Sequence, residues 1–209
     1  ETAIRVSQTE AGRFQLGQLY RQLGRSYYNR SLWDKALENY KEAYACAVQA
    51  NDKKLQMEVH NSLGTAYGSQ EQYDLAKKEF EQCAALAHEL QNHERTINSI
   101  FNIARIAYKL NDLETAMGSY EKAYPLIQKS KNKKLELEYY QYMGFVYFEM
   151  HHFESALECS SKVHALSLEL DDRMSFERAL AIQARTYARL GLDKKAKALI
   201  EQAIDLAIQ

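Results

Sequence analysis

The sequence predicts an all-α fold made of antiparallel helix pairs that stack on one another. Three observations predict it. Helix-favouring residues dominate a chain of 209 residues that contains only 8 glycines and 1 proline, and straight side chains lose little rotamer freedom in a helix. A pattern of small and aromatic residues recurs every 40 residues. Asn, Asp and Gly residues, which favour turns, fall between the segments of that pattern.

The repeat consists of columns of residues that lie 40 positions apart. One column pairs an apolar or polar residue with a small one, at Leu23-Gly24, Leu63-Gly64, Ile103-Ala104, Met143-Gly144 and Gln183-Ala184. Alanine follows twelve residues later in every repeat, at Ala36, Ala76, Ala116, Ala156 and Ala196. Two helices approach closely only where their side chains are small, so these columns mark where the helices of a pair should touch. One pair cannot bury such faces alone, and neighbouring pairs must therefore stack.

The repeats divide the chain into successive segments. Residues 1–12 are expected to form the end of a preceding helix and a turn at Gly12. Five repeats follow, at 13–52, 53–92, 93–132, 133–172 and 173–209. Pro125 should kink the second helix of the third repeat or end it early, because proline removes a backbone donor. The last helix, with Ile204 and Ile208, has no polar capping helix after it, so we expect the native array to continue in both directions or this end to meet a partner.

The first repeat carries the residues that identify a family. It reads Tyr20, Leu23-Gly24, Tyr27, Ala36, Tyr40 and Ala43, and in this pattern it resembles the tetratricopeptide repeat (TPR) family. The usual family period is about 34 residues, whereas the longer period here is similar to that of Pins-type and rapsyn-like scaffolds. The resemblance implies a right-handed α-α superhelix, a TPR solenoid. It also implies that the first helix of each repeat lines a concave groove that takes an extended peptide or a helix.

Positions that flank the packing stripe of the first helices form the expected groove. They hold seven cations and three anions, a net charge of +4 on a chain of net charge −1. Six of the cations are arginine, which suits carboxylates, and the anions are Glu58, Glu138 and Glu149. Asparagines there could hold backbone amides, and aromatic residues could act as anchors. The predicted partner-binding residues are Arg21, Arg25, Tyr28, Asn61, Asn98, Phe101, Asn102, Arg105, Tyr108, Lys109, Phe148, Arg185 and Arg189.

The sequence speaks against several other classes of function. It contains no glycine-rich phosphate loop, HExxH or CxxC motif, and no apolar run long enough to cross a membrane. Cys46, Cys83 and Cys159 are odd in number and widely spaced, which favours a reducing, cytoplasmic location. His151-His152 is interpreted as a solvated turn. We therefore expect no enzyme, no cofactor and no metal, and the near-neutral charge makes nucleic acid an unlikely partner class.

The leading hypothesis is a scaffold or adaptor that binds an acidic or mixed peptide or helix in the groove. The alternative is a structural assembly element that self-associates or docks through its terminal helices or its convex face. RNA binding by the basic groove, and service as the recognition arm of a catalytic domain elsewhere in a longer chain, also stay open.

Overall fold

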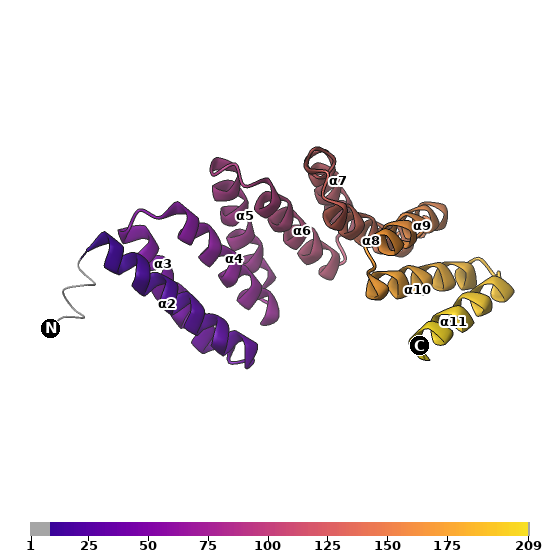
Figure 1. Ribbon diagram of the computed structural model, residues 1–209, viewed down its shortest axis with the longest axis horizontal. Coiled ribbons are helices and arrows are strands. Elements are labelled where there is room, and N and C mark those ends of the chain that lie inside the picture. The colour runs from indigo at the N-terminus through magenta and orange to yellow at the C-terminus, as the bar shows by residue number, and fades with distance from the viewer. Residues whose placement is uncertain (1–8, 209) are drawn as a thin grey trace. The chain divides into compact units, whose positions relative to one another are not determined.

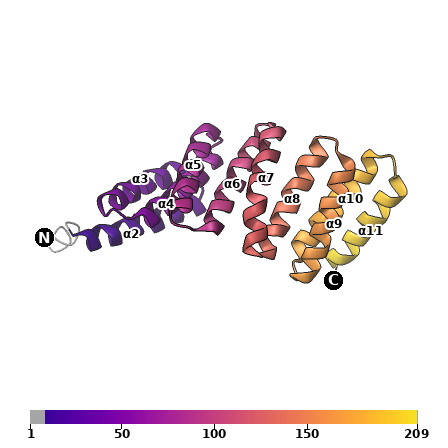
Figure 2. The ribbon, with the colours of Figure 1, turned by 90° about the horizontal axis from the view of Figure 1, so that it is seen from above.

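The computed structural model describes residues 9–208, except for the side chains of residues 10–11 and 205–208 (Figures 1 and 2). The expected preceding helix in residues 1–8 therefore lies outside the described part. Within that part the chain forms ten helices and no strand. It divides into two compact units, unit 1 at Glu1–Ile106 and unit 2 at Ala107–Gln209, and each is described by itself.

Both units are built from helix pairs. Unit 1 contains α2 (Glu10–Asn29), α3 (Trp33–Gln49), α4 (Lys53–Ser69), α5 (Tyr73–Glu89) and α6 (His93–Lys109) as far as Ile106. Unit 2 contains the end of α6, then α7 (Leu113–Ser130), α8 (Lys133–Glu149), α9 (Phe153–Glu169), α10 (Arg173–Arg189) and α11 (Asp193–Ile208). In unit 1, α2 packs on α3 and α4 on α5, and in unit 2, α8 packs on α9 and α10 on α11. The predicted all-α solenoid of antiparallel pairs is confirmed within each unit.

First helices of successive repeats also contact each other. The helix α2 meets α4 in unit 1, and α8 meets α10 in unit 2, while α3 contacts α4 and α9 contacts α10. A first helix thus lies against the second helix of its own repeat, the second helix of the repeat before it and another first helix. One side remains for solvent, and that side carries the candidate site.

The turns repeat as regularly as the helices. A residue with positive φ falls every 20 residues, at Ser31, Asn51, Glu71, Gln91, Asn111, Lys131, His151, Asp171 and Gly191. At the first of these, the N–H of Ser31 donates to the carbonyl of Tyr28 at 2.9 Å and the N–H of Leu32 donates to that of Tyr27 at 3.0 Å. This is the Schellman arrangement that ends a helix sharply. Its recurrence sets the spacing of every helix.

The start of α2 differs from the prediction. The helix begins at Glu10, and the hydroxyl of Thr9 accepts a hydrogen bond from the N–H of Gly12 at 3.0 Å. The turn predicted at Gly12 is therefore wrong. A threonine N-cap satisfies a free N–H of the first turn, so the glycine lies inside the helix and α2 reaches 20 residues instead of the 17 of α3.

Pro125 does not end α7, so the predicted early stop is wrong. The helix runs on to Ser130. Pro125 is exposed, while Ala123 and Ile127 on either side of it are buried. The missing N–H costs one backbone hydrogen bond on the solvent side, and the buried neighbours keep the segment against the core.

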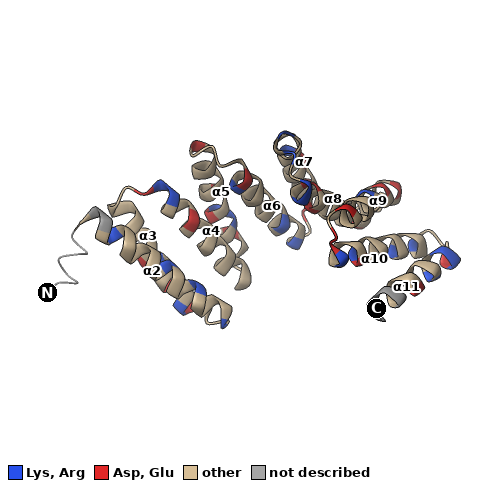
Figure 3. Ribbon diagram, in the orientation of Figure 1, with Lys and Arg blue, Asp and Glu red and all other residues tan. Residues whose placement is uncertain are grey.

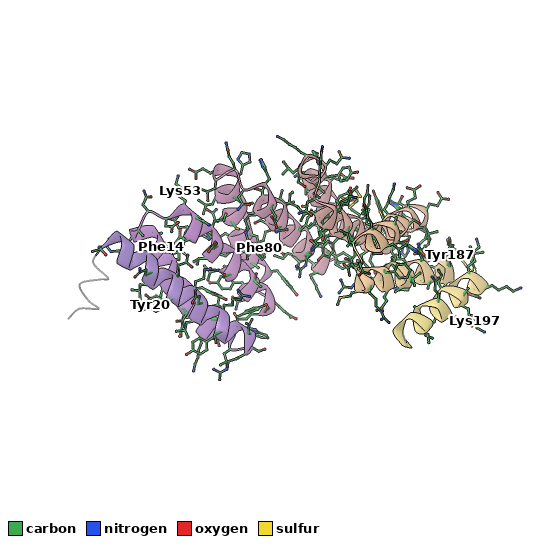
Figure 4. The ribbon with its side chains drawn as sticks, in the orientation of Figure 1. Phe14, Tyr20, Lys53, Phe80, Tyr187 and Lys197 are labelled. Atoms are coloured by element: carbon green, nitrogen blue, oxygen red, sulfur yellow. The ribbon has the colours of Figure 1, made fainter. Side chains whose placement is uncertain are left out.

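The core follows the predicted columns. Ala36, Ala76, Ala116 and Ala156 are all completely buried. The aromatic column packs beside them, with Tyr40 in the core cluster of α2 to α4. Phe80, labelled in Figure 4, belongs to the cluster of α4, α5 and α6. The close approach of α2 and α3 at Gly24 leaves no room for a Cβ atom, which would lie 2.6 Å from Cε1 of Tyr40.

Candidate partner-binding surface

The first-helix surface of unit 1 begins with an ion pair between α2 and α4. Nη2 of Arg21 lies 3.1 Å from Oε2 of Glu58, and both side chains are half-buried. The guanidinium of Arg21 also donates to Oε1 of Gln18 at 3.3 Å. The positive charge of Arg21 is therefore already paired within the protein. The partner in this pair, Glu58, is one of the three anions predicted for the groove.

A hydroxyl pair joins the same two helices closer to their C-terminal ends. The hydroxyls of Tyr28 and Ser69 lie 2.9 Å apart, and Ser69 also donates to the carbonyl of Thr65 at 3.1 Å. The carbonyl of Asn61 accepts from the hydroxyl of Thr65 at 2.8 Å, so its backbone is engaged. Tyr28 therefore serves first to join α2 to α4, and its half-buried ring edge is what remains for a partner.

The residues of α6 present a polar edge. Nη1 of Arg105 donates to Oδ1 of Asn102 at 3.2 Å, which fixes the exposed guanidinium on the helix surface. Asn98 lies one turn before Asn102, and both are half-buried. Phe101 is only 3% exposed, so its predicted use as an exposed anchor is wrong.

The first-helix surface of unit 2 centres on Phe148 in α8 and two arginines in α10. The guanidinium carbon of Arg185 lies 4.4 Å from the centre of the Phe148 ring, and that of Arg189 lies 6.0 Å from it. Both distances suit cation–π attraction. Phe148 itself is 4% exposed, so it too is wrong as an exposed anchor. It serves instead as a platform beneath the arginines.

Glu149 lies near both Arg185 and the end of α6. Its Oε1 lies 3.7 Å from Nη2 of Arg185, and its negative charge also acts on the hydroxyl of Tyr108. Burial, and then the nearby negative charge of Glu149, raise the pKa of Tyr108 above its ordinary value, while Arg185 lowers it. Tyr108, Glu149 and Arg185 thus form one polar cluster, and Tyr108 stays protonated at neutral pH.

Four cations of the predicted partner-binding set lie at the surface without a carboxylate partner in the described part of the chain. They are Arg25 and Arg105 in unit 1 and Lys109 and Arg189 in unit 2, and all four are exposed. Basic residues are visible along α2 and α10 in Figure 3. The positive charge available to a partner therefore comes mainly from these four residues, whereas Arg21 and Arg185 already contact internal glutamates.

The side chains that the structure describes contain no cluster of His, Cys, Asp and Glu that could hold a metal ion. No described helix is long and apolar enough to cross a membrane. The three cysteines are buried, and burial raises the pKa of Cys159 to about 12. A buried thiol that stays protonated is a poor nucleophile.

Sequence reasoning missed the pairing roles of Glu58 and Glu149. Both were counted only as anions of the groove. They lie 37 residues after Arg21 and 36 residues before Arg185, which is close to one repeat. A search for opposite charges about one repeat apart on the first helices would have found both pairs.

The sequence pattern of the tetratricopeptide repeat matches residues 15–87, 55–129 and 177–207. The chain belongs to the tetratricopeptide repeat family. The family resemblance seen in the sequence is therefore confirmed. Among curated relatives, "Tetratricopeptide repeat protein 29" of Trypanosoma brucei brucei (strain 927/4 GUTat10.1) is 24% identical over 180 residues. The match covers 83% of the present TPR chain and only 37% of that relative.

Solved structures confirm the TPR fold. BtubC (BKLC) from P. vanneervenii has a TM-score of 0.85 at 19% identity, and the match covers 99% of this chain and 86% of that one. A putative kinesin light chain with TPR-like repeats from Podosopora anserina has a TM-score of 0.74 at 19% identity, covering 91% and 94%. A Rap protein complexed with Competence and Sporulation Factor has a TM-score of 0.75 at 15% identity, covering 96% and 55%. At these identities the likeness concerns the fold alone.

Proposed function

We propose that this TPR chain is a non-enzymatic protein–protein interaction scaffold whose first helices bind an acidic or mixed-charge peptide or helix. The observation that carries the proposal is the set of exposed cations Arg25, Arg105, Lys109 and Arg189, which have no carboxylate partner in the described residues. Three of the four are arginines, whose planar forks match carboxylates. The Rap protein complex is consistent with a TPR fold that binds a partner.

Charge reversal on the first helices tests the proposal. The variant carries Arg25→Glu, Arg105→Glu and Lys109→Glu, and the probe is a short fluorescein-labelled peptide of alternating Asp and Leu. Fluorescence anisotropy should show that wild-type protein binds this peptide and that the variant binds it at least about tenfold more weakly, since attraction becomes repulsion. Raised salt should weaken wild-type binding because the contacts are exposed.

The matched control reverses three exposed lysines on the second helices. Lys41, Lys77 and Lys122 lie on α3, α5 and α7, so the change in net charge is identical and it is divided in the same way between the two units. The control should retain most of the affinity. Equal loss in both variants would show a response to net charge only, and unchanged binding in the first-helix variant would refute the assignment of the surface.

A second candidate function, assembly through a terminal helix, rests on the exposed face of α11. Ile200 is 51% exposed, whereas Tyr120 in the same column of the third repeat is 1% exposed. Ile204, one turn further, is also exposed. Under this candidate, light scattering should show an apparent mass that rises with protein concentration, and the variant Ile200→Ser with Ile204→Ser should abolish the rise. A constant mass in the wild type would remove this candidate.

A further inference from the structure

Arg185 in unit 2 is held from two sides. The buried ring of Phe148 lies under its guanidinium at 4.4 Å, and the carboxylate of Glu149 lies beside it at 3.7 Å. Both residues belong to the end of α8, while Arg185 belongs to α10. The ring restricts the orientation of the planar group, so its outer edge is available in a fixed position.

The two contacts differ in strength. A charge-assisted hydrogen bond between an arginine and a carboxylate measures roughly 2.7–2.9 Å, so the separation of 3.7 Å between Arg185 and Glu149 is loose. The two side chains are 53% and 42% exposed, and exposed pairs contribute little. The guanidinium is therefore well placed by Phe148 but only weakly occupied by Glu149.

Arg189 completes the arrangement. It lies one helical turn after Arg185 on the same helix, so the two side chains are neighbours. Its guanidinium approaches the same ring at 6.0 Å, and no carboxylate pairs with it among the described residues. Two forks that share one aromatic platform can bind the two oxygens of a carboxylate, or two carboxylates in succession.

We propose that Arg185 and Arg189 form the specific site for an acidic side chain of the partner, and that Glu149 is an internal competitor which the partner's carboxylate displaces from Arg185. This inference rests on the proposed function, because it names the residues that recognise the acidic peptide. The side chain of Glu149 is 42% exposed, so water can solvate its carboxylate after it leaves Arg185. Displacement therefore leaves no buried, unpaired charge.

The variant Glu149→Gln tests the competition directly. It removes the internal negative charge and nearly preserves the size of the side chain. In fluorescence anisotropy with the labelled peptide of alternating Asp and Leu, Glu149→Gln should bind about two- to fivefold more tightly than wild type. The control Glu158→Gln makes the same change in net charge on α9, on an exposed residue. It should bind the peptide as wild type does.

A second variant tests the platform. Arg185→Lys keeps the positive charge but loses the planar fork and its stacking on Phe148. Its affinity for the acidic peptide should fall about threefold or more, and adding Glu149→Gln to it should recover little of the loss. Far-UV circular dichroism of each variant should match wild type, because both residues lie at the surface.

The outcomes separate the two levels of the argument. If wild type binds the peptide and Glu149→Gln binds no more tightly than Glu158→Gln, the internal competitor is refuted while the scaffold function stands. If Arg185→Lys binds as wild type, the site at Phe148 is refuted in the same way. If no protein in the series binds the acidic peptide, the proposed function fails, and this inference fails with it.

Discussion

Glycines at equivalent places in the repeat should respond in opposite ways to the same substitution. At Gly24 an added Cβ would lie 2.6 Å from Cε1 of Tyr40 and 3.1 Å from the carbonyl oxygen of Ala36. At Gly144, in unit 2, the atom nearest to the added Cβ would be Cβ of Cys159 at 3.4 Å. The difference arises because the aromatic column of the repeat holds Tyr40 in the first case and a small serine in the fourth repeat.

The expected magnitudes follow from two opposing effects. Replacing glycine by alanine inside a helix favours folding by about 0.8–1.0 kcal/mol, and overpacking a core costs about 1–3 kcal/mol. Tyr40 is buried and the oxygen of Ala36 belongs to the backbone, so Gly24→Ala should lower the free energy of unfolding by up to about 2 kcal/mol. Gly144→Ala meets only ordinary van der Waals contact and should raise it by about 0.5–1 kcal/mol.

Gly118 provides a reference for the effect of helix propensity alone, without any steric contact. It lies inside α7, and nothing would approach its added Cβ within 4 Å. Gly118→Ala should therefore raise the free energy of unfolding by about 1 kcal/mol, and subtracting this value from the others isolates the steric part. Urea unfolding followed by far-UV circular dichroism measures all three variants. A destabilised Gly144→Ala, or a stabilised Gly24→Ala, would refute the steric reasoning.

Four further substitutions have expected outcomes that the same unfolding assay can measure. Gln91 lies at φ 53°, and Gln91→Gly should raise the free energy of unfolding by about 0.5–1 kcal/mol. Gly191 lies at φ 71°, and Gly191→Ala should lower it by about 1 kcal/mol. Changes of the same sign in both variants would contradict the turn geometry. Pro125→Ala should stabilise by about 2 kcal/mol, because it restores a helical N–H, and no gain would show that α7 has adapted. The pKa of Asp172 lies below its ordinary value of 3.8, chiefly because the N–H of Ser175 donates to it. The contribution of Asp172 to the free energy of unfolding should be complete at neutral pH and lost as the pH falls from about 4 through the folded-state pKa. Asp172→Asn should remove this part of the pH dependence of stability.

Most of the fold could be predicted from the sequence, because stacking repeats impose the same packing on the same columns. The buried alanines and the αL turns follow one period along the whole described chain. The start of α2 was predicted wrongly because glycine was taken as a turn residue at Gly12. The hydroxyl of Thr9, which accepts a hydrogen bond from the N–H of Gly12, fixes where the first turn of the helix forms. The effect of Pro125 was overestimated because its exposure, which depends on tertiary packing, is not visible in the sequence.

The site was less predictable than the fold. Its helix faces could be inferred from the family resemblance, but not which flank of each face would be covered. Phe101 and Phe148 lie on flanks that packing buries, whereas Arg105 and Arg185 point to solvent. Contacts between first helices decide this, and they join residues about one repeat apart, beyond the reach of periodicity within a single helix.

The same contact recurs between first helices with different chemistry each time. Tyr28 meets Ser69, Tyr108 meets Glu149 and Phe148 meets Arg189, and each pair is 41 residues apart. Because the repeat fixes the geometry of these pairs, substitution within the two columns changes the exposed chemistry without changing the fold. The neutral hydroxyl pair of unit 1 offers hydrogen bonds, while the carboxylate and guanidinium pairs of unit 2 offer charge. Under the proposed function, unit 2 therefore offers an acidic side chain the neighbouring arginines Arg185 and Arg189, in addition to the other exposed cations of the first helices.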